Sequence, residues 1–207
     1  PRNGDYHVTD RRLRDLFTRA RSFGDEIALH GSWDSIDDCK GLAAEKAAVE
    51  SAARTTIRGS RQHYLRFSNP ETWACVSGAG LRYDATGGFP DRAGFKYGWS
   101  GCFHPFDLDQ LEPLPVIEIP LTCMDVTIAN YEKIPAELAL ERLTLLLDAA
   151  CDDVPGGAFV FLWHNIMGDR EQFPGYWDTF EYFFSVASGC ARFITLSQLC
   201  DEFEGAV

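Results

Sequence analysis

Apolar residues recur at three- and four-residue spacing in several segments of the chain, and this period is typical of amphipathic helices. The first such segment follows Asp10, whose side chain suits a helix cap. Asn69 and Pro70 likewise suit the cap and the first position of a later helix. Helices are predicted from Asp10 to Gly24, from residues 37–38, from Asn69 to Gly78 or Gly80, over residues 135–150, over residues 176–186, and after residue 196.

Short apolar runs lie between these helices and predict strands. The run at 158–163 is continuously apolar, as expected for a strand with both faces buried. Strands are predicted over residues 27–29, 56–61, 81–83, 116–122, 158–163 and 192–196. The alternation of strands and helices predicts an α/β fold with a parallel sheet. Residues 85–114, rich in glycine, proline and aromatics, form a connection long enough to carry function.

Composition predicts one substantial folded domain over residues 1–207, because 45% of the residues are hydrophobic. The net charge of -12 argues against a nucleic-acid partner, which demands a basic surface. No apolar stretch is long enough to span a bilayer, so no membrane insertion is expected. The chain begins Pro-Arg-Asn-Gly-Asp, which is typical of a loop inside a longer protein. The oligomeric state is left open.

The seven cysteines are dispersed, odd in number and without a Cys-x-x-Cys pair. This pattern fits neither a zinc knuckle nor a disulfide framework. We therefore expect reduced, mostly buried thiols and a cytoplasmic location.

Three of the five histidines follow predicted strands. His30 ends the run Glu-Ile-Ala-Leu-His, His63 lies in Arg-Gln-His-Tyr, and His164 ends Phe-Leu-Trp-His. In α/β barrels the carboxyl ends of the strands carry the active-site side chains. Histidine binds metal ions and transfers protons near neutral pH, so the three are candidate site residues.

The ordered set of segments Leu-His-Gly-Ser, Arg-Gln-His-Tyr-Leu-Arg-Phe, Tyr83-Asp84 and Trp-His-Asn resembles the polysaccharide deacetylase family, the NodB homology domain. The similarity is greatest to a divergent branch found near bacterial surface-polysaccharide genes, and it runs from about Asp10 to Leu199. The resemblance implies a distorted (β/α) barrel with fewer than eight regular strands. It also implies metal-dependent removal of an N-acetyl or related acyl group from a sugar, here in lipopolysaccharide O-antigen biosynthesis.

The implied cofactor is a divalent metal, expected to be zinc, which the family holds with one aspartate and two histidines. Such a metal polarises the amide carbonyl and lowers the pKa of a bound water. His30 matches the first metal histidine, whereas Asp34 stands where the family has the second. Asp34 or His63, on the next strand, would complete the set, and we favour His63.

The resemblance also implies catalytic roles. Arg61 matches the arginine that holds a catalytic carboxylate, a task that suits the guanidinium fork. His164 matches the late histidine that protonates the leaving amine. Asp125 follows another strand, and we expect it to orient His164 as a carboxylate fixes an imidazole tautomer.

Three aromatic residues, Tyr64, Trp33 and Trp163, are candidates for stacking on sugar rings, although aromatic side chains more often serve packing. The family's first motif, an aspartate-rich strand end that supplies the base and one metal ligand, has no match before His30. The first strands of the barrel are thus expected upstream of Pro1 or lost, and the residues given are expected to be inactive or impaired.

Three hypotheses remain open at this point. The first is a metal-dependent sugar deacetylase, and the second is a non-catalytic carbohydrate-binding protein on a degenerate barrel. The third is a hydrolase of another C–N bond, such as that of a formamide. Bound metal separates the first from the second, and the acid released separates the first from the third.

Overall fold

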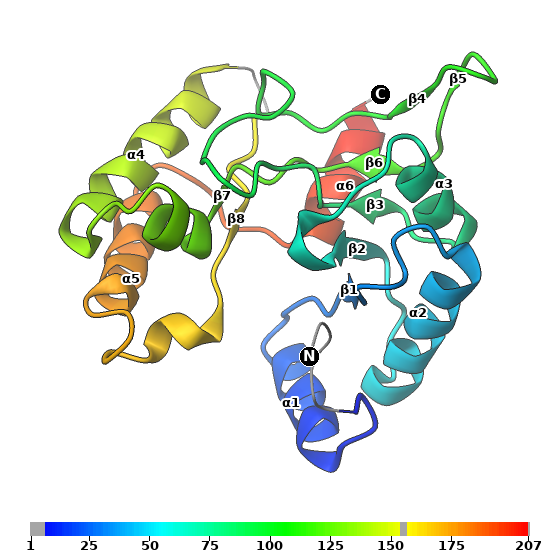
Figure 1. The fold of residues 1–207 in the computed structure, drawn as a ribbon, viewed down its shortest axis with the longest axis horizontal. Coiled ribbons are helices and arrows are strands. Elements are labelled where there is room, and N and C mark those ends of the chain that lie inside the picture. The colour runs from blue at the N-terminus through cyan, green and yellow to red at the C-terminus, as the bar shows by residue number, and fades with distance from the viewer. Residues whose placement is uncertain (1–6, 154–156, 207) are drawn as a thin grey trace. The chain divides into compact units, whose positions relative to one another are not determined.

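The computed structural model of the protein describes residues 7–153 and 157–206. The chain forms two compact units (Figure 1). Unit 1 contains Pro1–Thr86, Phe103–Ile119 and Thr195–Val207, and unit 2 contains Gly87–Cys102 and Pro120–Ile194.

Unit 1 is built on a parallel sheet with the strand order β1-β2-β3-β6. Its strands are β1 (Leu29–Gly31), β2 (Gly59–Gln62), β3 (Tyr83–Asp84) and β6 (Ile117–Glu118). Their order along the sheet is their order along the chain, which is the βα arrangement that the sequence predicts. All the carboxyl ends therefore lie at one edge of the sheet, and that edge is where α/β proteins bind ligands.

Four helices belong to unit 1: α1 (Arg11–Ser22), α2 (Cys39–Ala53), α3 (Glu71–Gly78) and α6 (Leu196–Ala206). The predicted caps hold for the first two, since Asp10 accepts a hydrogen bond from the Arg12 N–H at 2.8 Å and Asp38 from the Gly41 N–H at 2.9 Å. The prediction of Asn69 as the cap of α3 is wrong. Pro70 precedes that helix without a side-chain cap.

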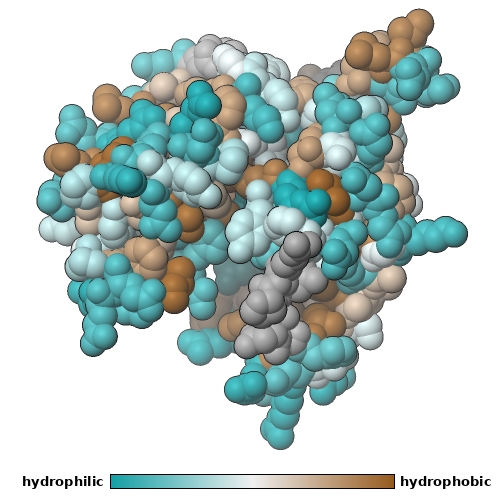
Figure 2. All heavy atoms as spheres, in the orientation of Figure 1, coloured by the Kyte–Doolittle hydropathy of each residue, from teal (hydrophilic) through white to brown (hydrophobic). Residues whose placement is uncertain are grey.

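The long connection predicted at 85–114 carries a hairpin of β4 (Phe106–Asp107) and β5 (Glu112–Pro113). The Asp107 carboxylate closes its turn by accepting hydrogen bonds from the N–H groups of Asp109 and Gln110, at 2.8 and 3.0 Å. Leu108 and Leu111 are exposed at the tip, where Figure 2 shows hydrophobic residues projecting from the surface.

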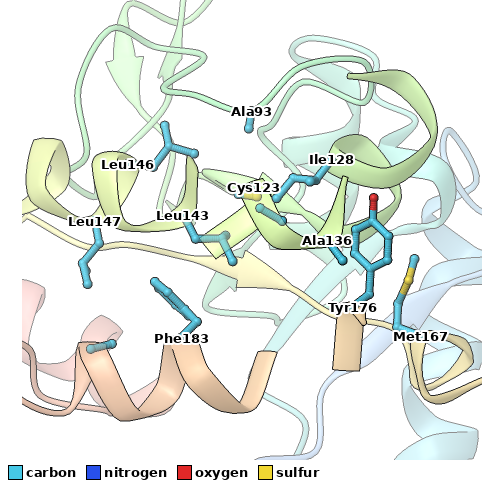
Figure 3. Close-up of a cluster of buried hydrophobic side chains, with 12 residues drawn as sticks. Ala93, Cys123, Ile128, Ala136, Leu143, Leu146, Leu147, Met167, Tyr176 and Phe183 are labelled. Carbon is cyan, nitrogen blue, oxygen red and sulfur yellow. The ribbon is translucent and has the colours of Figure 1, made fainter. Parts of the chain in front are cut away.

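Unit 2 contains the parallel pair β7 (Cys123–Met124) and β8 (Phe161–Leu162) and two long helices, α4 (Ala136–Asp153) and α5 (Tyr176–Ala187). Two single-turn helices follow the strands, η2 (Thr127–Tyr131) and η3 (Asn165–Gly168). Side chains of α4 and α5, Leu143 and Phe183 among them, meet in a buried apolar cluster (Figure 3).

Three strand predictions need correction. The strand predicted at 116–122 shrinks to β6 and β7 begins only at Cys123, because Pro120 follows β6 and has no N–H for a sheet hydrogen bond. The strand predicted at 158–163 shrinks to β8, which is half-buried and pairs with β7 alone among the described strands. Residues 192–196 form no strand, because no neighbouring strand of the described chain pairs with them.

The prediction of reduced cysteines also needs correction, because Cys39 and Cys75 form a disulfide across 36 positions of sequence. The two crossover connections place α2 and α3 against each other, so cysteines that are distant in sequence meet. The free thiols among the described residues are Cys102, Cys123 and Cys200, which are buried, and Cys151 and Cys190, which are exposed.

Within residues 7–153 and 157–206, no helix combines the length and the apolar character that a membrane crossing requires.

Candidate active site

Two of the predicted metal ligands meet at the carboxyl ends of β1 and β2 in unit 1. His30 is the central residue of β1, and His63 follows β2 directly. The Nε2 atom of His30 lies 2.9 Å from the Nδ1 atom of His63, and the ring planes meet edge-on at 84°. The parallel register of β1 and β2 explains this proximity, since it leaves both histidines at the same edge of the sheet.

Asp34, the alternative ligand, is exposed in the loop between β1 and α2. The described residues contain no group of three or more histidine, cysteine or acidic side chains placed to hold a metal ion. The imidazole pair suits zinc chemically, and two nitrogens bound to one tetrahedral zinc lie roughly 3.3 Å apart. The observed 2.9 Å separation is that of a hydrogen bond between the two imidazoles, and both rings carry the nitrogen atoms that zinc takes as ligands.

Aromatic side chains extend the histidine pair. The ring of Tyr64 lies 4.5 Å from that of His63 and 5.7 Å from that of Trp33, measured between centroids. Tyr64 is 68% exposed, whereas Trp33 is half-buried. Tyr64 and Leu65 have φ values of 57° and 52°, a left-handed conformation that costs non-glycine residues about 1–3 kcal/mol each. Backbone strain of this kind gathers at functional sites, and here it stands beside His63.

Arg61 pairs with His30 in the sheet register, and its Nε–H donates to the Ala85 carbonyl oxygen at 2.7 Å. Burial lowers the pKa of the Arg61 guanidinium, and the nearby Asp84 carboxyl opposes that shift. Arg61 makes no ion pair in the part of the chain that the structure describes. The carboxylate that the family's arginine would hold is therefore not among its described contacts.

Two acidic residues that the sequence reasoning assigned no role lie deep in the same sheet. Asp84 and Glu118 are register partners on β3 and β6, and neither is exposed to solvent. Asp84 accepts hydrogen bonds from the Ser60 hydroxyl at 3.1 Å and from the Thr86 hydroxyl and N–H at 2.9 and 3.0 Å. The Trp73 indole N–H donates to Glu118 at 2.7 Å.

Burial raises the pKa of the Asp84 carboxyl, although its hydrogen bonds to Thr86, Ser60 and Glu118 act in the opposite direction. In the sequence Asp84 belongs to one of the segments that carry the family resemblance, and Glu118 is marked only as an acidic residue in an apolar run. That signal does not distinguish a buried carboxyl from an exposed one.

Unit 2 holds a second pair of predicted site residues, Asp125 and His164. Asp125 follows β7 and is fully buried, and its Oδ1 lies 2.7 Å from Nδ1 of His164. Its other carboxylate oxygen accepts the backbone N–H of His164. The His164 side chain remains 42% exposed. A carboxylate at Nδ1 keeps the proton on that nitrogen and leaves Nε2 to exchange protons.

Trp163, the residue before His164, packs its ring 5.3 Å from that of Phe180. Its indole Nε1 is buried and has no hydrogen-bond partner among the described residues. Trp163 thus packs against Phe180, and stacking of Trp163 on a sugar ring remains a prediction.

Comparison with solved structures places this fold. A protein assigned as a polysaccharide deacetylase from Mycobacterium smegmatis matches with a TM-score of 0.71 at 19% identity, over 94% of this chain and 68% of that one. A second assigned polysaccharide deacetylase, from Pseudomonas aeruginosa PAO1, matches with a TM-score of 0.62 at 14% identity, over 92% of this chain and 63% of that one.

The PuuE allantoinase matches with a TM-score of 0.64 at 15% identity, over 94% of this chain and 64% of that one. No family model and no curated protein matches the sequence. This chain thus spans about two thirds of the length of these solved neighbours. The predicted polysaccharide deacetylase fold is confirmed, and at these identities the likeness shows the fold alone.

Proposed function

We propose that the protein is a metal-dependent hydrolase that removes an N-acetyl or related acyl group from a sugar. The observation that carries this proposal is the 2.9 Å contact of His30 with His63 at the ends of adjacent parallel strands. The fold shared with polysaccharide deacetylases supports a sugar or glycan as substrate. We place the reaction in the cytoplasmic synthesis of a bacterial surface polysaccharide such as the O-antigen of lipopolysaccharide.

In this proposal His30 and His63 hold a divalent metal ion, with zinc as the expected metal and Asp34 as the alternative ligand. A bound zinc ion supplies Lewis acidity and an activated water near neutral pH. The two imidazoles contribute by presenting nitrogen donors from two strand ends that the sheet register fixes.

His164 acts as the general acid. Asp125 holds its Nδ1–H, so the Nε2 nitrogen donates a proton to the amine nitrogen as the C–N bond breaks. The buried Asp125 carboxylate also stabilises the imidazolium form that this role requires. Arg61 uses its Nε–H on Ala85, and its terminal nitrogens suit a carboxylate.

The sugar ring would stack on aromatic side chains. Tyr64 is the best placed, because it is exposed and contacts His63. Trp33 supports Tyr64 from its half-buried position, and Trp163 is the candidate beside His164.

The test uses the full-length protein, stripped with a chelator and reloaded with zinc or cobalt. We expect one metal ion per chain by elemental analysis, and acetate release from N-acetylated amino-sugar oligomers. His30→Ala should abolish both metal binding and acetate release. His7 is an exposed histidine that is hydrogen-bonded to Thr9, and His7→Ala should abolish neither.

Two outcomes would contradict the proposal. Sugar binding without any metal would favour the carbohydrate-binding alternative on a degenerate barrel. Release of formate from N-formyl sugars, with none of acetate, would favour a hydrolase of another C–N bond. The match to the allantoinase is the observation that favours this third hypothesis.

A further inference from the structure

The loops that follow the two histidine strands are joined to each other at two points. The His30 loop (residues 32–38) connects β1 to α2, and the His63 loop (residues 63–70) connects β2 to α3. One joint is the side chain of Arg66, and the other is the disulfide between Cys39 and Cys75.

Arg66 is the inner joint. Its backbone N–H donates to the carbonyl oxygen of His63 at 3.2 Å, so it belongs to the same turn as that histidine. Its Nη1 donates to the carbonyl oxygen of Trp33 in the His30 loop. The guanidinium carbon also lies 4.0 Å from the centroid of the Trp33 ring, a cation–π contact. A single side chain therefore spans from the turn of His63 to the opposite loop.

The disulfide is the outer joint. Cys39 is the first residue of α2, directly after the His30 loop, and Cys75 lies in α3, which follows the His63 loop. Cys75 is buried, whereas Cys39 is exposed. A reductant therefore has access to the bond from the Cys39 side.

Two hydrogen bonds connect the helices to the histidine loops. Glu45 of α2 accepts the N–H of Ser32 at 3.0 Å, two residues after His30. Thr72 of α3 accepts the N–H of Ser68 at 2.9 Å, at the far end of the His63 loop. A shift of α2 against α3 is thereby passed to both histidine strands.

We propose that Arg66 and the Cys39–Cys75 disulfide form a clamp that sets the separation of His30 and His63, and that a dithiol reductant opens its outer joint. The inference rests on the proposed function in one respect, that the histidine pair holds a metal ion. Arg66 is a positioning residue in this clamp. Disulfides are rare in reducing compartments except where they respond to redox state, so a cytoplasmic location would make this bond a switch.

The chemistry of opening is thiol–disulfide exchange. A thiolate of the reductant attacks the exposed Cys39 sulfur, the S–S bond breaks, and Cys75 leaves as a thiolate that takes up a proton. The second thiol of the reductant then attacks its own sulfur in the mixed disulfide and releases Cys39. Two electrons and two protons pass to the protein, and the reductant becomes a disulfide.

The test compares metal affinity and local exchange in one background, Cys151→Ser with Cys190→Ser, which removes the exposed free thiols. Cobalt binding is followed by its absorption, and dithiothreitol is removed by desalting under argon before metal is added. Reduction, Cys39→Ser and Arg66→Ala should each weaken binding about ten-fold, the scale of a lost supporting contact in a metal site. Arg66→Lys should recover part of the loss through the ring contact.

Hydrogen–deuterium exchange supplies a readout that needs no metal. Exchange should accelerate in residues 32–38 and 63–70 on reduction or in Arg66→Ala, and stay unchanged in α4. Arg170→Ala, which breaks an exposed ion pair with Asp178, is the matched control and should alter neither measurement.

The outcomes separate the two proposals. Unchanged affinity and unchanged exchange in the reduced protein and in Arg66→Ala would overturn the clamp. If the parent protein binds no cobalt but residues 32–38 and 63–70 exchange faster on reduction, the clamp proposal stands and the metal-site proposal is wrong. If Cys39→Ser fails to fold, the reduced parent protein gives the same comparison.

Discussion

In each unit a histidine contacts a second polar side chain at the ends of two adjacent parallel strands, and the two contacts differ in chemistry. In unit 1 the pair is His30 with His63, at the ends of β1 and β2. In unit 2 the pair is Asp125 with His164, after β7 and β8. Parallel pairing explains both, because it brings the residues that follow neighbouring strands to one edge.

The difference lies in the partner of the imidazole. The buried Asp125 carboxylate contacts Nδ1 of His164 and leaves Nε2 directed away from that contact. In the pair of His30 and His63 the described contact is between two imidazole nitrogens. The proposed function assigns metal binding to the pair in unit 1 and acid–base chemistry to the pair in unit 2, and the variants below test that division.

The largest effect is expected for His63→Ala. Loss of a ligand should weaken metal binding more than about a hundred-fold, beyond the 10–100-fold that a supporting residue costs. Titration with cobalt against a competing chelator measures the change. Asp125→Asn should bind metal as the parent does, and an equal loss in both variants would contradict the division of roles.

The next effect is expected for Asp125→Asn on the rate. An asparagine that donates its N–H₂ to Nδ1 would favour the wrong tautomer of His164, and general acid catalysis contributes about 10²–10⁴-fold. We expect kcat to fall by roughly that factor with KM and metal content unchanged. Acetate release at saturating substrate is the measurement, and an unchanged kcat would remove Asp125 from the mechanism.

These two pairs show which features of the structure can be predicted from the sequence. The caps Asp10 and Asp38 and the strand-end histidines follow from local patterns, since the chemistry of each lies within a few residues of sequence. The contact between His30 and His63 depends on the register of β1 with β2, and the sequence favours His63 from its place on the next strand, whereas the family pattern points to position 34.

Other features depend on three-dimensional neighbours and leave no local signal. The disulfide of Cys39 with Cys75 requires α2 and α3 to lie together, and a spacing of 36 residues does not predict that. Asp84 and Glu118 are buried because β3 and β6 pair within the sheet, although acidic residues are seldom fully buried.

The buried apolar cluster of unit 2 predicts an effect on the free energy of unfolding. Leu143 is fully buried in the apolar cluster of unit 2 (Figure 3). Leu143→Ala should lower the free energy of unfolding by about 2–5 kcal/mol, the cost of lost apolar contact plus a cavity. Leu145→Ala, at an exposed position of the same helix, should stay within about 0.5 kcal/mol. Urea unfolding compares the two, and equal losses would mean that the cluster does not determine stability.

The smallest effect is expected for the buried carboxyls of unit 1, Asp84 and Glu118. Burial raises the pKa of Asp84 above its usual value near 3.8, so the folded state binds this proton more tightly than the unfolded state. The resulting stability is present below pH 3.8 and is lost as the pH rises through the folded-state pKa, with a slope of at most about 1.4 kcal/mol per pH unit.

Asp84→Asn keeps an oxygen acceptor for Ser60 and Thr86 but cannot titrate, so its stability should fall less steeply with pH than that of the parent. Urea unfolding from pH 4 to pH 8 measures both slopes, and Trp73 reports locally because its indole donates to Glu118.

Asp109→Asn, in the exposed hairpin turn, is the control and should keep the parental slope. Parallel curves for the parent and Asp84→Asn would show that burial of this carboxyl does not govern the pH dependence of unit 1.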